Sequence, residues 1–173
     1  MATVTRDLSR LQEGLAACRD RLTEGGDAAV ARVAPDVSAW TVGEQLWHVL
    51  HATALGLAAV QRILDEEEPD EGRPSLAWHT LMLVGRIPRG KGQAPSVVQP
   101  PEVVDRDKVA RELAESASLL ARIAGRVDEL PDAAGRVEHR AFGWLDAVQW
   151  LRFLAIHLEH HLRLVAAIEK SAG

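Results

Sequence analysis

The sequence of 173 residues contains no tyrosine, only two phenylalanines and a single cysteine, Cys18. Without tyrosine, no phenol is available as a catalytic acid or base. A single cysteine excludes an internal disulfide and any zinc site built from several cysteines. Because Cys18 lies on an apolar helical stripe, we expect it in the core, and the scarcity of cysteine fits a reduced, cytoplasmic location.

Long apolar runs are also missing. No stretch approaches the roughly 20 apolar residues of a membrane-spanning helix, and the first residues show no apolar run of the kind found in secretory signals. The 25 aspartates and glutamates outnumber the 20 lysines and arginines, which argues against a nucleic-acid partner. With 47% apolar residues, we expect a single folded domain over residues 1–173. What the sequence does contain is seven histidines.

Four segments have apolar residues at the three- and four-residue spacing of a helix with one buried face. Gly25 and Gly26 end the first segment. The second opens with Thr41 and Glu44, which have the spacing of a capping box. No segment alternates apolar and polar residues as a strand does, so we expect no sheet. The four expected helices cover roughly residues 8–24, 41–65, 105–130 and 144–170.

The connection between the second and third helices is long and rich in helix breakers. Residues 68–104 hold six of the eight prolines of the chain. One short apolar run, Leu76–Val84, predicts a short helix inside this crossover. Four long helices with one long crossover predict an all-α fold, a four-helix bundle.

The fourth helix carries the most specific pattern in the sequence. His157 and His161 lie four residues apart on a stripe whose other positions are apolar, so both should face the interior of the bundle. Two imidazoles one helical turn apart can chelate one metal ion. For this pair alone, the alternative is two buried neutral histidines bonded to backbone or carboxylate groups. His160 lies off the stripe, and we expect it to be exposed.

The second helix supplies candidates for a third ligand. Glu44, His48 and His51 share one face; His48 lies nearer the centre of the apolar arc, although either histidine could meet the pair. Three neutral imidazoles around a divalent ion leave one coordination position open, as in catalytic sites, and nitrogen ligands suit zinc or nickel. Glu44 has two interpretations: a catalytic group that accepts a proton or orients a ligand, and the third residue of the capping box.

The remaining histidines have simpler explanations. His79 lies beside Trp78 in the short crossover helix and is interpreted as a packing or pocket residue. We expect Trp78, His79 and Met82, together with His51, to line a pocket next to the metal. His139 precedes a turn that leads into the fourth helix, which favours a structural capping role, with a position at the mouth of the pocket as the alternative.

Two motifs resemble signatures of the DinB/YfiT-like superfamily. Residues 40–48, Trp-Thr-Val-Gly-Glu-Gln-Leu-Trp-His, are similar to the start of its second helix, where a tryptophan and a serine or threonine precede the first metal histidine. Residues 139–163 resemble the last-helix signature of an uncharacterised subgroup, with His-x-x-Phe-Gly, a tryptophan and His-x-x-His-His. Arg140 replaces the usual proline and Leu164 a common glutamine; neither change removes a ligand, and both alter the rim of the pocket.

The resemblance implies an up-down-down-up bundle in which His48, His157 and His161 bind a divalent metal ion. The better-understood members of the family are metal-dependent S-transferases that use bacterial low-molecular-weight thiols, and others are hydrolases or isomerases. The first hypothesis is therefore a metal-dependent enzyme that acts on a small-molecule substrate with a low-molecular-weight thiol as cosubstrate. The alternative is a non-enzymatic small-molecule-binding or interaction module with a vestigial metal site. A homodimer is compatible with both hypotheses.

Overall fold

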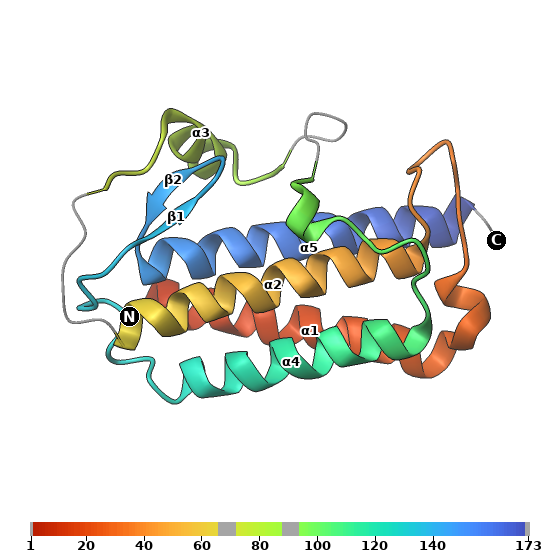
Figure 1. Ribbon diagram of the computed structural model, residues 1–173, viewed down its shortest axis with the longest axis horizontal. Coiled ribbons are helices and arrows are strands. Elements are labelled where there is room, and N and C mark those ends of the chain that lie inside the picture. Colours follow the sequence, from red (N-terminus) through yellow and green to blue (C-terminus); the bar gives the residue numbers. More distant parts are fainter. Residues whose placement is uncertain (1, 66–71, 88–93, 172–173) are drawn as a thin grey trace.

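Four long helices pack together as a bundle in the computed structural model, which describes residues 2–65, 72–87 and 94–171 (Figure 1). α2 packs against α4 and α5, and α1 packs against the same two helices. Figure 1 shows α1 and α5 running in one direction and α2 and α4 running in the other. The bounds of the four helices are α1 Ala2–Val30, α2 Val42–Asp65, α4 Arg106–Ala124 and α5 Ala147–Ser171.

The four predicted long helices are present, with changes at their ends. α1 continues beyond the two glycines, and Gly26 interrupts its helical backbone with a φ of 59°, a left-handed conformation that glycine adopts without strain. α4 ends at Ala124, earlier than predicted, because the chain then turns: the N–H of Arg126 donates to the carbonyl of Ile123, three residues back. α5 begins at Ala147, slightly later than predicted.

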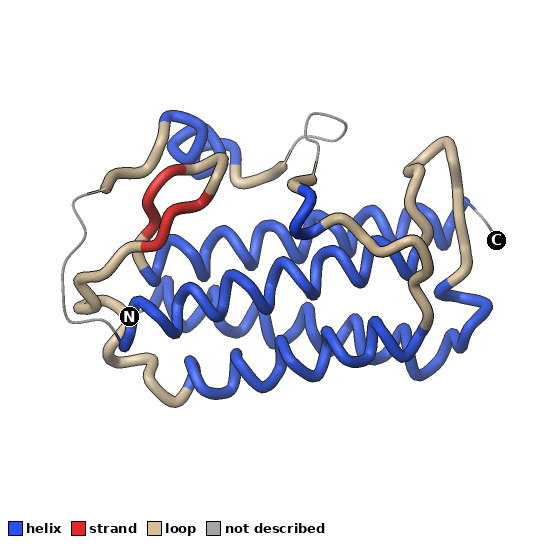
Figure 2. Tube along the Cα trace, in the orientation of Figure 1, coloured by secondary structure: helices blue, strands red, loops and turns tan. Residues whose placement is uncertain are grey.

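The prediction that the chain contains no sheet is wrong at one place. β1 (Val137–His139) and β2 (Gly143–Leu145) pair as an antiparallel hairpin, drawn in red in Figure 2. Strands of three residues are too short to show alternation in the sequence. Gly143 has a φ of 74°, and a Cβ at this position would lie 2.7 Å from the carbonyl oxygen of Arg73. The hairpin therefore depends on a glycine that lies against the start of the crossover.

The crossover contains α3 (Leu76–Val84), at the predicted residues, and a short 3-10 helix, η1 (Ser96–Val98). The Ser75 hydroxyl caps the N-terminus of α3, and the N–H of Ser75 donates to the carbonyl of Phe142 at 2.7 Å. These contacts attach α3 to the hairpin at the end of the bundle where α5 begins (Figure 1). η1 packs against α2 instead, which places this part of the crossover beside the bundle.

The core lies between the four helices and includes the cysteine. Cys18 is fully buried, as predicted, and burial raises the pKa of its thiol to about 12. Within the described ranges, no helix combines the length and apolar character needed to cross a membrane. The largest side chains that are fully buried are Leu11, Leu46, Leu50, Leu57, Ile63, Ile123, Leu130, Leu145, Leu151, Leu154, Ile156 and Leu158.

One buried carboxylate joins α1 to α5. Asp7 is completely buried, and Arg10 and Arg152 each donate to its Oδ1 over 2.7 Å. Arg10 also donates to the carboxylate of Glu159 at 2.6 Å. The charge of Asp7 is thus compensated by two guanidinium groups whose outer edges reach solvent.

Candidate metal centre

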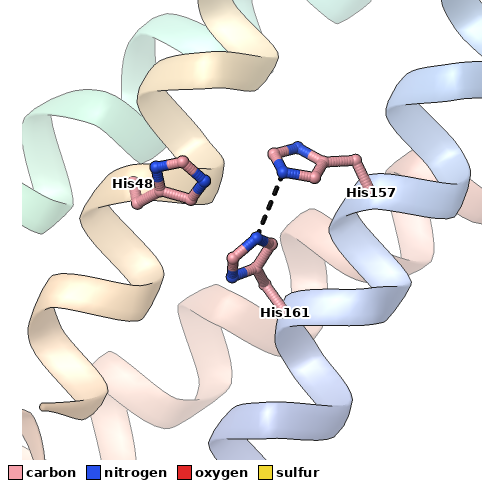
Figure 3. A group of neighbouring side chains, drawn as sticks. All are labelled: His48, His157 and His161. Carbon is pink, nitrogen blue, oxygen red and sulfur yellow. Dashed lines mark hydrogen bonds between the residues drawn. The ribbon is translucent and has the colours of Figure 1, made fainter. Parts of the chain in front are cut away.

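Three imidazoles converge between α2 and α5. Figure 3 shows His48 on α2 and His157 and His161 on α5, with their rings pointing toward one another. One nitrogen from each ring lies within 4.8 Å of those of the other two, and the Nε2 atoms of His157 and His161 are 3.1 Å apart. His48 and His161 are only 4% and 7% exposed, and His157 is half-buried. The structure therefore brings together the three histidines that the sequence resemblance implies.

The arrangement fits a metal ion of ordinary size. Zinc binds imidazole nitrogen at about 2.0–2.1 Å, so two nitrogens at tetrahedral positions lie roughly 3.3 Å apart. The 3.1 Å between the nitrogens of His157 and His161 already matches this separation. A nitrogen of His48 lies within 4.8 Å of both, so the three rings surround one position. Three imidazole nitrogens are a donor set that suits divalent zinc or nickel.

Hydrogen bonds at Nδ1 orient two of the three rings. His48 donates from Nδ1 to the carbonyl of Val98 in η1 over 2.7 Å, and His161 donates from Nδ1 to Oε1 of Gln45 over 2.6 Å. A neutral imidazole that donates from Nδ1 presents the lone pair of Nε2, the atom that faces the cluster. Nδ1 of His157 is buried with no hydrogen-bond partner among the described residues. Two of the three ligands are thus fixed in the tautomer that binds metal.

The environment keeps all three imidazoles neutral. Burial lowers the pKa of His48 below 6.5, although its bond to Val98 acts in the opposite direction. Burial also lowers the pKa values of His157 and His161 well below 6.5, and the neighbouring imidazoles add to this effect. Only the neutral imidazole can bind a metal ion, so little proton competition is expected at pH 7.

His51, the alternative third ligand, lies outside this cluster. Its Nδ1 pairs with the carboxylate of Glu112 on α4 at 3.0 Å, and its ring stacks on Trp47 with centroids 4.6 Å apart. The structure therefore groups His48, and not His51, with the pair on α5.

Glu44 makes the contacts of a capping residue. Its carboxylate accepts the N–H of Thr41 at 2.7 Å, and the Thr41 hydroxyl accepts the N–H of Glu44 at 3.1 Å. These reciprocal bonds begin α2 and so set the rotation at which the helix presents His48. They match the structural interpretation of Glu44.

The crossover residues predicted to line a pocket have different environments. Trp78 is buried against Phe142, with ring centroids 6.1 Å apart, and Met82 packs partly buried against the core. His79 is exposed. None of the contacts that the structure describes for these residues involves the three-histidine cluster, and their role in a pocket stays a prediction.

The two remaining histidines lie near the cluster. The imidazole of His139 accepts the N–H of Ala141 at 3.1 Å and stacks on Phe142, as expected of a residue that shapes the turn before α5. Burial lowers the pKa of His139 to about 4. His160 is half-buried rather than exposed, and its ring lies edge-on to that of His161 with centroids 5.1 Å apart. The expectation that it is exposed is wrong because its ring packs against that of His161, which covers part of it.

The residues that contact the ligands but were not predicted as site residues include Gln45, Val98 and Phe153, whose ring stacks on that of His157 with centroids 5.3 Å apart. Gln45 had a signal in the sequence, since it is a polar residue on the buried face of α2, about one turn before His48. Val98 had none, because every residue offers a main-chain carbonyl.

The comparisons with known proteins point to one family. A protein-family model described as the DinB superfamily matches residues 6–165, a range that includes the three histidines and extends from α1 to α5. Comparisons with curated proteins and with solved structures return no match. The matched range covers most of the sequence, and the bundle and the histidine cluster are those that the resemblance implies. The chain belongs to the DinB superfamily.

Proposed function

We propose that this chain is a metal-dependent enzyme whose divalent ion, zinc or nickel, is held by His48, His157 and His161. The observation that supports this most directly is the convergence of three neutral imidazoles on one point between α2 and α5. Structural zinc sites fill all four positions with protein ligands, whereas a three-ligand site leaves one position for water or substrate. The donor set is therefore that of a reactive centre.

The ion would supply Lewis-acid chemistry by lowering the pKa of a thiol or a water molecule in the open position. The residues of the chain prepare that position. The carbonyl of Val98 and the amide of Gln45 keep the rings of His48 and His161 oriented. The burial of both rings limits the access of water, which strengthens electrostatic interactions within the site.

We further propose that a low-molecular-weight thiol is conjugated to a small electrophilic substrate: the thiol loses its proton, its sulfur bonds to the electrophilic carbon, and the substrate either releases a leaving group or takes up a proton. The choice of a thiol follows the resemblance to better-understood members of the family, and the charge of the site supports it. The groups bonded to the ligands are a carbonyl and a carboxamide, so they leave the charge of a divalent ion uncompensated. An uncompensated dication favours an anionic ligand such as a thiolate in the open position. A catalytic role for Glu44, a single domain and a homodimer stay predictions of the sequence.

Metal analysis of protein purified without a metal-affinity column tests the metal centre. We expect one zinc or nickel ion per chain, and a loss of at least 100-fold in affinity when His48, His157 or His161 is replaced by alanine. His79→Ala, which removes an exposed histidine, is the matched control and should bind like the wild type. At a free metal concentration of 100 times Kd, the ion should add about 2.7 kcal/mol to the free energy of unfolding. Wild-type protein that binds no stoichiometric metal would contradict the proposal.

The reaction is tested separately with metal-loaded protein. Thiol consumption is measured with a panel of bacterial low-molecular-weight thiols and small electrophiles, with His161→Ala as the inactive control. Metal binding without turnover of any thiol would leave the metal centre in place and refute the S-transferase assignment. It would favour the small-molecule-binding module.

A further inference from the structure

A chain of hydrogen bonds leads from the loop before α2 to one metal ligand. Gln45 is buried in α2, with 2% of its surface exposed. Its Oε1 lies 2.6 Å from Nδ1 of His161, and its Nε2 donates to the hydroxyl oxygen of Ser38 at 2.8 Å. The same oxygen accepts the N–H of Trp40 at 3.0 Å. Four polar groups are thus connected, and the hydroxyl oxygen of Ser38 accepts from both Trp40 and Gln45.

The orientation of the Gln45 carboxamide matters because its nitrogen can only donate a hydrogen bond and its oxygen can only accept one. With the amide nitrogen of Gln45 bonded to Ser38, only the carbonyl oxygen faces His161. This oxygen can only accept, so Nδ1 of His161 must carry the proton. Nε2 of His161 then presents its lone pair toward His48 and His157. The opposite tautomer would place a proton at Nε2, where the metal ion has to bind.

The loop holds Ser38 in place through its own backbone. The N–H groups of Val37 and Ser38 both donate to the carbonyl of Ala34, at 2.8 and 2.9 Å, and Ala34 and Ser38 form an isolated β-bridge. The hydroxyl of Ser38 is therefore attached to a turn that is fixed independently of the cluster. The position of the amide of Gln45 follows from this turn and from the rotation of α2.

We propose that Gln45 is a positioning residue of the metal centre, which holds His161 as a neutral ligand with Nε2 free, and that Ser38 holds Gln45. This inference rests on the proposed metal function. Gln45 touches neither the ion nor the substrate; it acts through the tautomer and the orientation of His161. Partners of this kind commonly change metal affinity by about 10- to 100-fold when they are removed.

Two substitutions at the same buried position separate positioning from packing. Gln45→Met keeps the length and burial of the side chain but removes the acceptor, so zinc affinity should fall by about 10- to 100-fold. Gln45→Glu keeps an acceptor at the cost of a buried charge, so it should bind zinc at least as tightly as the wild type although the metal-free protein unfolds at a lower temperature. A purely structural role predicts that affinity and stability fall together in both variants.

Zinc affinity is measured by competition with a chromophoric chelator, and the geometry of the centre by the visible absorption of the cobalt(II)-loaded protein. The matched control is Gln61→Met on the same helix, because the amide of Gln61 pairs with Asp65 at the far end of α2. This variant should behave like the wild type. Ser38→Ala should reduce affinity less than Gln45→Met does. The inference would be overturned if the zinc affinity of Gln45→Met lay within threefold of that of the wild type. It would also be overturned if Gln45→Glu lost as much zinc affinity as Gln45→Met.

A second measurement does not depend on metal. Long-range proton–nitrogen NMR of the metal-free protein reports which nitrogen of His161 carries the proton. We expect Nδ1–H in the wild type and loss of that preference in Gln45→Met. A wild-type protein with this tautomer but no metal binding would refute the proposed function while leaving the hydrogen-bond chain intact. A wild-type His161 protonated at Nε2 would refute the inference itself.

Discussion

Replacing His139 by phenylalanine should reverse the order of stability of the wild type and the variant between neutral and acid pH. The imidazole packs among the rings of Phe142, Phe153 and Trp150, and burial lowers its pKa from 6.5 to about 4. In the unfolded chain the same group titrates near 6.5, so the unfolded state takes up a proton that the folded state does not. The contribution of His139 is therefore complete above pH 6.5 and is lost progressively as the pH falls toward 4.

The magnitude follows from these two pKa values. At pH 4.5 the difference in proton uptake lowers the free energy of unfolding by roughly 2.5 kcal/mol relative to alkaline pH, and the partial exposure of His139 reduces this to about 2 kcal/mol. Phenylalanine keeps the aromatic packing but leaves the N–H of Ala141 to water at an exposed position. At neutral pH the variant should thus lie within about 1 kcal/mol of the wild type. The two stability curves should cross at about pH 6.

Urea denaturation followed by tryptophan fluorescence, at several pH values between about 7.5 and 4.5, measures both curves. Subtracting the free energy of unfolding of the wild type from that of the variant at each pH cancels the contributions of the other titrating groups. His79→Phe, at an exposed histidine of α3, controls for the loss of a histidine as such and should give a nearly constant difference. If the difference for His139→Phe is also constant over this range, the burial argument for His139 is refuted.

Three further predictions concern the rest of the fold. Asp7→Ala should lower the free energy of unfolding by about 2–3 kcal/mol in urea denaturation, because it leaves two partly buried guanidinium groups without their carboxylate; an unchanged midpoint would contradict this. Cys18 should react with a thiol reagent only after unfolding, because burial raises its pKa to about 12, and rapid labelling of the native protein would refute its core position. Gly143→Ala should cost about 1–3 kcal/mol, measured by thermal unfolding, because it forces a side chain into a left-handed backbone next to the carbonyl of residue 73.

The parts of the structure that could be predicted from the sequence depend on local rules. The periodic apolar positions of the four long segments decide where helices form, and the capping box at Thr41 and Glu44 marks the start of α2. The spacing of His157 and His161 places both on one face of α5 without knowledge of any other helix.

The start of α5 had a local signal that the periodicity concealed. Asp146 and Gln149 form a reciprocal capping pair: the carboxylate of Asp146 accepts the N–H of Gln149 at 2.8 Å, and the side chain of Gln149 accepts the N–H of Asp146 at 3.0 Å. Apolar residues just before this pair continue the helical spacing, but they belong to β2. The hairpin itself has no local signal, because it depends on the docking of Gly143 against the start of the crossover.

The choice between His48 and His51 could not be made from α2 alone, since the two lie three residues apart on neighbouring parts of one face. It is decided by α4, where Glu112 pairs with His51 and directs it away from the cluster. A contact between residues 61 positions apart leaves no trace in the spacing of one helix. The same holds for Val98, which reaches His48 from the crossover.

The three ligands of the metal centre are oriented in three different ways. His161 is oriented by a side chain of the neighbouring helix, His48 by a main-chain carbonyl of η1, and His157 only by packing against Phe153. The bundle therefore provides the positions of the ligands, whereas Gln45 in α2, bonded to Ser38 before that helix, and Val98 in the crossover set the tautomers of His161 and His48. Because a metal ion accepts only one tautomer at each Nε2, changes in these connections alter the centre without moving any ligand. Helix periodicity can identify the ligands of such a site and a buried polar partner such as Gln45, but not a partner such as Val98, whose main-chain carbonyl leaves no pattern in the sequence.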